Sequence, residues 1–218
     1  MSNLYFIRHG ESTANVLRIF DNQTGDYPLT DIGIQQVKLT ADWFASRPNH
    51  SIYTSPIPRA AQTARIIADR MNLPFKVIPE FKEFQIGDLE GKPMSGNARA
   101  IFDQVLHEWI RGNHQVAFPH GENYNQLIYR LKFGLKKITS EYPGKDLLVV
   151  THSGLLIYGI KALFPEVNWN VFLAEHTSHC SITTIYEPEI HDSKSFQLIG
   201  WAKIDHLPAD LIKSNYQD

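Results

Sequence analysis

The chain has 218 residues, of which 43% are hydrophobic and 20% charged, and its formal net charge is −2. This length suits one α/β domain with its own core, so we expect residues 1–218 to form a single domain. The near-neutral charge excludes whole-molecule attraction to nucleic acid or to an anionic membrane, and no apolar run approaches the roughly 20 residues of a membrane span.

Three short apolar runs in the first part of the chain predict strands, at residues 4–7, 52–53 and 75–78. The polar, glycine-bearing segment 11–26, which follows the first run, predicts a loop. Because these runs are separated by stretches with helical periodicity, we expect helices between the strands.

Two such helices are expected. Thr30 is a good N-cap, and apolar residues recur every three or four positions from there up to Phe44. A second helix is predicted to begin near Arg59 and to continue to Met71. Its apolar stripe consists of small and medium-sized residues, so it can pack closely on a sheet.

The middle of the chain predicts a helical insertion between strands. Segment 80–93 is charged and aromatic, contains two glycines and is too irregular for a core element. Helical spacing of apolar residues then covers 98–109 and 124–138, with a loop at 111–121. We expect residues 92–122 to be the part of this insertion that determines substrate specificity.

The fully apolar run 147–150 predicts a central strand buried on both faces, and it is followed closely by His152. A helix is expected after Gly154, and two antiparallel strands are expected near 181–186 and 196–204. Alternating strands and helices predict an α/β fold, a three-layer αβα sandwich with a mainly parallel sheet. Ligands bind such sheets at the carboxyl ends of the strands.

Two predicted strands end in histidine and glycine at this edge of the sheet. His9 follows Arg8 at the end of the first strand, and His152 precedes Ser153 and Gly154. Arg59 stands at a helix entrance, where backbone N–H groups face outward. An arginine presents five donors in a fixed fork that matches phosphate oxygens. Arg8 and Arg59 are therefore expected to hold a dianionic phosphoryl group from two sides.

On these residues the chain resembles the histidine phosphatase superfamily, also called the phosphoglycerate mutase-like family. The matching motifs occur in the expected order along nearly the whole chain: 8–15, 29–33, 55–64, 83–91 and 151–154. The resemblance implies the phosphoglycerate mutase-like fold. It implies that His9 takes up the phosphoryl group while Arg8, Arg59 and His152 hold its oxygens. It further implies that Asn15 and Ser153 help to bind the substrate and that Glu83 gives a proton to the leaving group.

The physical chemistry of these roles is coherent. A neutral imidazole can attack phosphorus through one nitrogen only if the other nitrogen keeps its proton, held by an acceptor such as a backbone carbonyl. The cationic frame supplies the charge stabilisation that a metal gives in other phosphoryl-transfer enzymes, so we expect neither a metal nor another cofactor. Glu83 must be protonated when the leaving oxygen departs, which requires a raised pKa and thus a desolvated position.

Three functions are compatible with this pattern. The favoured one is a phosphatase that hydrolyses a small phosphomonoester through a phosphohistidine on His9. The alternatives are a cofactor-dependent phosphoglycerate mutase and a non-catalytic phosphate-binding module. In a mutase we would expect an adjacent arginine pair within a longer insertion, whereas Arg99 and Arg111 are separated here. With His114 and His120, these arginines either line the substrate entrance or are solvated charges of the insertion.

Other signals are weaker. His176 and His179 form an H-x-x-H motif, but no set of carboxylates or cysteines completes a convincing metal site, so pocket-wall or surface histidines are the preferred interpretation. Cys180 is the only cysteine, which excludes an internal disulfide, and we expect it to be buried and inert.

With no apolar leader evident at the N-terminus, a cytoplasmic location is expected. The expected partner is a small phosphorylated molecule, and the oligomeric state is open, a homodimer included.

Overall fold

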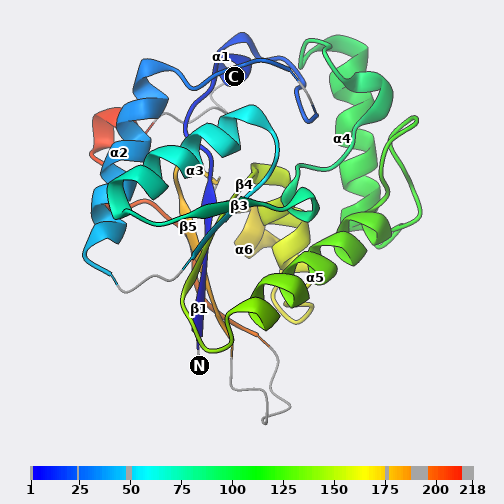
Figure 1. The fold of residues 1–218 in the computed structure, drawn as a ribbon. Helices are drawn as coiled ribbons and strands as arrows, with labels where there is room; N and C mark the ends of the chain where they lie inside the picture. Colours follow the sequence, from blue (N-terminus) through cyan, green and yellow to red (C-terminus); the bar gives the residue numbers. More distant parts are fainter. Residues whose placement is uncertain (1, 24, 48–50, 175–176, 188–195, 213–218) are drawn as a thin grey trace.

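The strands form one mixed sheet. The computed structural model of the chain describes residues 2–23, 25–47, 51–174, 177–187 and 196–212. Within these residues, six strands lie in the order β3-β2-β4-β1-β5-β6 (Figure 1). Their bounds are β1 Ser2–Arg8, β2 Ser51–Thr54, β3 Phe75–Val77, β4 Leu147–Thr151, β5 Ile182–Glu187 and β6 Gln197–Lys203. The first four are mutually parallel, and β5 pairs antiparallel with both β1 and β6. The predicted mainly parallel sheet is confirmed.

The helices begin and end at residues suited to those positions. Their bounds are α1 Thr13–Leu17, α2 Asp31–Ala45, α3 Pro58–Met71, α4 Gly96–Ile110, α5 Tyr124–Glu141 and α6 Trp169–Ala174. Thr30 is the N-cap of α2, and its hydroxyl accepts a hydrogen bond from the Gly33 N–H at 3.0 Å, as the sequence predicts. Proline is tolerated in the first turn of α3, and the C-cap that follows the helix is Asn72, a residue type that adopts the left-handed conformation found there.

Two cores on opposite faces of the sheet make the molecule three-layered. One core joins alternate strand residues to α2 and α3: Ile7, Val37, Phe44, Ala64, Ile67, Leu148 and Val150. The other joins the remaining strand residues to α4, α5 and the helix after β4: Leu4, Phe6, Leu106, Leu131, Leu135, Val149 and Leu155. Figure 1 shows these helices on the two sides of the strands. The αβα sandwich is therefore confirmed, with both faces of the central strands buried.

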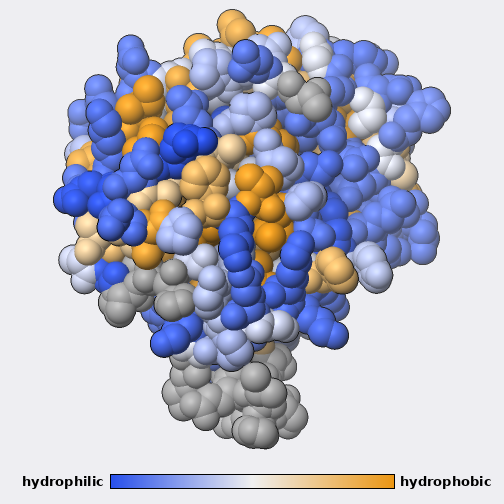
Figure 2. Space-filling model, in the orientation of Figure 1, coloured by the Kyte–Doolittle hydropathy of each residue, from blue (hydrophilic) through white to orange (hydrophobic). Residues whose placement is uncertain are grey.

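The outer helices present polar faces to solvent. Figure 2 shows hydrophilic side chains over most of one face of the molecule, especially over α4 and α5, with apolar residues gathered near its middle. No helix within the described ranges is long and apolar enough to cross a membrane.

One expectation about local structure needs correction. The prediction of a loop over 11–26 is wrong for Thr13–Leu17, which form α1. This helix is shorter than two turns and leaves Val16 and Leu17 exposed, so it carries no apolar stripe that a periodicity search could detect. The helix expected after Gly154 is present, but Leu155–Ile160 are wound as a π-helix. The short helix α6 was not predicted.

Candidate active site

The ends of β1 and β4 bring two histidines together. The strands are neighbours and parallel, with Arg8 opposite Thr151, and the His9 N–H donates to the Thr151 carbonyl at 3.0 Å. The next residues along each strand therefore leave the sheet side by side, and the rings of His9 and His152 lie 5.2 Å apart between centroids. The apolar strands thus position these polar side chains at the carboxyl edge of the sheet.

His9 is held as a neutral imidazole with one defined tautomer. Its Nδ1 lies 2.7 Å from the Gly10 carbonyl oxygen, which can only accept, so Nδ1 carries the proton. The other nitrogen, Nε2, accepts a hydrogen bond from the Arg59 Nε at 2.9 Å. Burial, assisted by the Arg59 and Arg8 charges, holds the pKa of His9 well below its usual 6.5. The arrangement matches the requirement for a nucleophilic Nε2.

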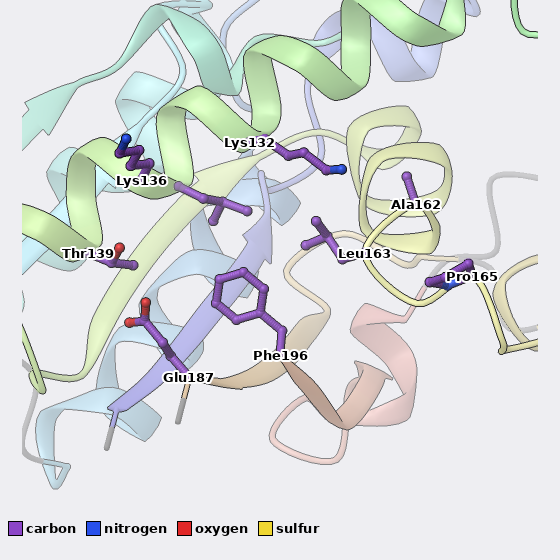
Figure 3. Close-up of a pocket in the computed structure, with 9 residues that line it drawn as sticks. Lys132, Lys136, Thr139, Ala162, Leu163, Pro165, Glu187 and Phe196 are labelled. Atoms are coloured by element: carbon purple, nitrogen blue, oxygen red, sulfur yellow. The ribbon is translucent and has the colours of Figure 1, made fainter. Parts of the chain in front are cut away.

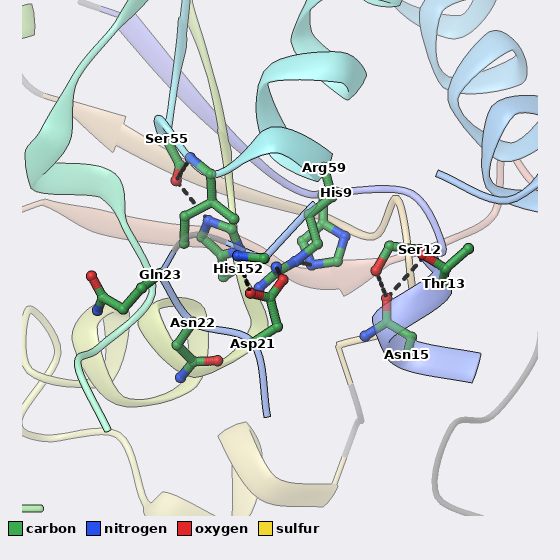
Figure 4. A network of polar contacts seen from close by, with 12 residues as sticks. His9, Ser12, Thr13, Asn15, Asp21, Asn22, Gln23, Ser55, Arg59 and His152 are labelled. Carbon is green, nitrogen blue, oxygen red and sulfur yellow. Dashed lines mark hydrogen bonds and ion pairs between the residues drawn. The ribbon is translucent and has the colours of Figure 1, made fainter. Parts of the chain in front are cut away.

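Arg59 connects His9 to a buried carboxylate. It lies in the first turn of α3 and is 5% exposed. Its Nη1 forms an ion pair of 2.6 Å with the Asp21 Oδ2, while its Nε contacts His9 (Figure 4). Asp21 lies within the segment that the sequence predicts as a polar loop, and no signal in the sequence singled it out.

Arg8 is held by a different segment, through Thr177 and His179. Its Nη1 donates to the Thr177 carbonyl at 2.5 Å, and its Nη2 lies 3.0 Å from the His179 Nε2. His179 is 1% exposed, and burial, with the neighbouring Arg8 charge, keeps its pKa well below 6.5. The same Nε2 lies 3.2 Å from the Asn15 Oδ1, but a guanidinium can only donate, so we assign Nε2 as the acceptor from Arg8 and Nδ1 as the protonated nitrogen. The H-x-x-H motif thus supplies a neighbour of Arg8, whereas His176 lies outside the described residues.

Glu83 reaches the same pocket from the irregular segment after β3. Its carboxylate accepts hydrogen bonds from the backbone N–H groups of Gly154 and Leu155, both at 2.7 Å, and of Phe84 at 3.1 Å. Burial raises its pKa, and these hydrogen bonds and Arg59 oppose that rise. Position 154 must be glycine because a Cβ there would lie 2.7 Å from the Glu83 Oε1 and 2.2 Å from the Phe84 Cε1.

His152 has one partnered and one unpartnered nitrogen. Its Nε2 lies 2.7 Å from the Ser55 Oγ, whose position is fixed by the Ile57 N–H at 3.1 Å (Figure 4). Its Nδ1 is buried and has no hydrogen-bond partner in the described part of the chain. A buried polar atom of this kind is normally satisfied by a further group, so Nδ1 can serve a ligand beside His9.

These side chains surround one cavity of about 380 Å³. Its lining includes six of the seven residues for which the sequence predicts a role: Arg8, His9, Asn15, Arg59, Glu83 and Ser153. The seventh, His152, is not a lining residue, and its ring lies 5.2 Å from that of His9. The Asn15 Oδ1 accepts from the N–H and the hydroxyl of Ser12, which fixes the amide at the start of α1, and the Ser153 Oγ lies 2.5 Å from the Thr177 Oγ1.

The far wall of the cavity comes from α4 and the segment before it. Within residues 92–122 the lining residues are Met94, Arg99, Phe102, Asp103 and Leu106. Of the four basic residues considered for the entrance, Arg99 lies in the lining and the other three do not. Arg111 pairs with Glu108, His114 packs on Tyr124, and His120 contacts Asp88. They lie beyond the part of α4 that faces the cavity.

A second hollow lies elsewhere and lacks such chemistry. It has a volume of about 580 Å³ and is lined by four aliphatic residues, by Thr139 and Phe196, and by the charged residues Lys132, Lys136 and Glu187 (Figure 3). Among the described residues that line it there is neither histidine nor arginine, so they do not repeat the combination of a histidine with two arginines found in the first cavity. Within the described residues, no group of three or more His, Cys, Asp or Glu side chains is arranged to hold a metal ion.

With this geometry established, comparison with known proteins defines the class. The family model of the histidine phosphatase superfamily (branch 1) matches residues 4–201. The chain belongs to this superfamily and is an enzyme of the histidine phosphatase type.

Of two similar proteins, one is named as a phosphatase and the other as a phosphoglycerate mutase. The "Uncharacterized phosphatase PhoE" of Bacillus subtilis is 31% identical over 77% of this chain and 78% of its own length. The "Probable phosphoglycerate mutase GpmB" of Yersinia pestis is 32% identical over 70% of each chain. Among solved structures, Bacillus stearothermophilus YhfR aligns with a TM-score of 0.80 and 25% identity, covering 94% of this chain and 99% of its own.

Proposed function

We propose that the chain is a metal-independent phosphatase that hydrolyses a small phosphomonoester through a phosphohistidine on His9. The observation that carries the proposal is the state of His9. Its Nδ1 donates its proton to the Gly10 carbonyl, and its Nε2 carries the lone pair and accepts a hydrogen bond from Arg59. Such a nitrogen is a nucleophile without needing a separate base.

In the first step, the His9 Nε2 forms a bond to phosphorus as the bond from phosphorus to the ester oxygen breaks. Glu83 gives its proton to the departing oxygen, so that a neutral alcohol leaves. Its raised pKa favours the protonated form that this step requires. Arg59 exchanges its contact with Nε2 for contacts with the phosphoryl oxygens, which Arg8 and His152 hold from the other sides.

In the second step, water attacks the phosphohistidine. The Glu83 carboxylate takes a proton from the water as oxygen bonds to phosphorus and the bond from phosphorus to Nε2 breaks. Phosphate is released, and His9 and Glu83 return to their starting states. The side-chain cations carry the charge stabilisation throughout, so we expect no dependence on a divalent metal.

The test is hydrolysis of p-nitrophenyl phosphate by the native protein and by His9→Ala. We expect turnover by the native enzyme, inhibition by vanadate and unchanged activity after EDTA treatment. His9→Ala should show no turnover and no acid-labile phosphoprotein after rapid quench. A phosphoprotein that survives in His9→Ala would exclude His9 as the nucleophile, and loss of native activity with EDTA would contradict the metal-independent mechanism.

A phosphoglycerate mutase is the second candidate, favoured by the similarity to a protein named as one. It would return the phosphoryl group from His9 to the bound intermediate instead of to water. The cavity wall formed by residues 92–122 contributes a single arginine, Arg99, which already pairs with Asp103 at 2.7 Å. We therefore prefer the phosphatase. Efficient conversion of 3-phosphoglycerate to 2-phosphoglycerate in the presence of 2,3-bisphosphoglycerate would reverse this preference.

We also propose a cytoplasmic location for the enzyme. Support comes from the single cysteine, Cys180, which is fully buried and whose pKa burial raises to about 12. Such a thiol suits a reducing compartment and has no role in nucleophilic chemistry. Cell fractionation followed by immunodetection would test the location.

A further inference from the structure

Asp21 places a negative charge in a cavity that the proposed function requires to bind a dianion. The residue is 4% exposed and belongs to the cavity lining. Its Oδ2 accepts from the Arg59 Nη1 at 2.6 Å, and its Oδ1 accepts from the Gly25 N–H at 2.8 Å. The two steps of the proposed mechanism give this carboxylate no role.

The backbone around Asp21 is held in place. The Phe20 N–H donates to the Lys92 carbonyl at 2.9 Å, and the Asn22 side-chain amide donates to the Phe84 carbonyl at 3.0 Å. The Glu90 carboxylate also accepts from the Asn22 N–H at 3.0 Å (Asp21 and Asn22 are labelled in Figure 4). Because these bonds tie both neighbours of Asp21 to another segment, the carboxylate stays close to the cavity when a ligand enters.

The Arg59 guanidinium contacts both the Asp21 carboxylate and the His9 Nε2. Arg59 contacts the His9 Nε2 at 2.9 Å and Asp21 at 2.6 Å, so a phosphoryl group on or near Nε2 shares this arginine with the carboxylate. Like charges a few ångströms apart in a desolvated site repel each other strongly. The carboxylate also neutralises part of the cationic charge that attracts the dianion.

We propose that Asp21 is a fixed counter-anion that weakens the hold of the cavity on phosphate dianions and thereby promotes release of the product phosphate. The proposal rests on the proposed function, since it needs phosphate to bind beside His9. Product release often limits turnover in enzymes, and a pocket with two buried arginines would otherwise retain phosphate. Asp21 acts through Arg59 and through space, so it is a positioning and affinity-determining residue.

The alternative is that Asp21 only orients Arg59, and it predicts the opposite change in phosphate affinity when the carboxylate is removed. If the carboxylate served only to aim the guanidinium, removing it would weaken phosphate binding. If it competes with phosphate, removing its charge strengthens binding. Asp21→Asn separates the two effects because it retains the size of the side chain and one acceptor oxygen.

The experiment is calorimetric titration with inorganic phosphate, and inhibition by vanadate, at pH 8 for the native protein and the Asp21→Asn variant. We expect the Kd for phosphate to fall by roughly tenfold in Asp21→Asn, from the Coulomb energy of a unit charge at this range. Asp42→Asn is the matched control. It makes the same change of net charge at a surface ion pair with Arg70, where the Asp42 side chain is 54% exposed. Its Kd for phosphate should stay within about twofold of the native value.

Each outcome decides one question. Equal or weaker phosphate binding by folded Asp21→Asn overturns the counter-anion role, and so does an equal gain in Asp42→Asn. If Asp21→Asn does not fold, Asp21→Ser provides the same test with a smaller neutral side chain. Absence of phosphate and vanadate binding by the native protein would instead contradict the proposed function, so the two failures are distinguishable.

Discussion

The imidazole of His9 acquires its properties from one neighbour in the sequence and one distant residue. Gly10 fixes its tautomer, while Arg59, fifty positions away, contacts the other nitrogen. The cation on Arg59 and the burial of the ring both disfavour a second proton. A histidine in the same sequence motif but exposed to water would be partly protonated near neutral pH and a poorer nucleophile.

Glu83→Gln tests the proton donor. We expect kcat/KM for alkyl phosphates to fall by roughly 10²- to 10⁴-fold, because the leaving alkoxide needs a proton. The loss on p-nitrophenyl phosphate should be much smaller, since its leaving group is already stable as an anion. Steady-state kinetics on the two substrates would check this, and equal losses on both would argue against an acid role.

His179 should matter through the orientation of Arg8. His179→Phe keeps a ring of similar size but removes the acceptor 3.0 Å from the guanidinium. Loss of a hydrogen bond to a charged group corresponds to roughly tenfold or more in affinity, so we expect weaker vanadate inhibition and a higher KM. His179→Asn offers an amide oxygen to Arg8 and should recover much of the affinity. Unchanged inhibition of folded His179→Phe would refute this role.

Among the structural elements, the start of the helix after β4 is tightly constrained by the site. The N–H groups of Gly154 and Leu155 bind the Glu83 carboxylate, which requires very close approach of two backbone segments. The π-helix that follows lies next to this contact. π-Helical turns are common at functional sites, so the position of this one agrees with that tendency.

Gly154→Ala should therefore damage both activity and stability. Its Cβ would collide with Phe84 and Glu83, and we expect a loss of about 1–3 kcal/mol in the free energy of unfolding together with reduced turnover of alkyl phosphates. Gly200→Ala in β6 is the control, since its nearest neighbour would be at an ordinary 3.6 Å and it should cost under about 0.5 kcal/mol. Urea denaturation of both variants would measure the difference. Similar values for the two would contradict the steric explanation.

For the whole molecule, three buried neutral histidines make stability depend on pH. Burial is the largest cause that holds the pKa values of His9, His152 and His179 well below the 6.5 that they have when exposed. Below pH 6.5 the unfolded chain therefore binds more protons than the folded one, and stability falls as pH falls. The raised pKa of Glu83 acts in the opposite direction at lower pH.

We expect the free energy of unfolding to decrease between pH 6.5 and 5.5, with each of these histidines contributing up to about 1.4 kcal/mol per pH unit. Urea denaturation at pH 7.5, 6.5 and 5.5 would measure the slope. His179→Asn removes one titrating group and should reduce the slope by about that amount. A stability independent of pH over this range would show that these histidines are not neutral in the folded state.

Much of the fold could be predicted from local patterns. The apolar run 147–150 predicts a doubly buried strand, and β4 is that strand, because such runs have few other stable environments. The N-cap Thr30 marks the start of α2 correctly. By contrast, α1 was missed because two exposed apolar residues in one and a half turns give no periodic signal.

The sequence by itself located the polar residues that follow the ends of the buried strands. Arg8, His9 and His152 are visible because a buried strand can deliver polar groups only at its end. Only the tertiary structure decided the contacts of these groups. It shows which tautomer His9 adopts, what Arg59 contacts, and that His179 contacts the Arg8 guanidinium. It alone showed Asp21 in the cavity, since a carboxylate in a polar segment has no local pattern that reveals its partner. Such contacts join segments that meet only after the sheet has formed.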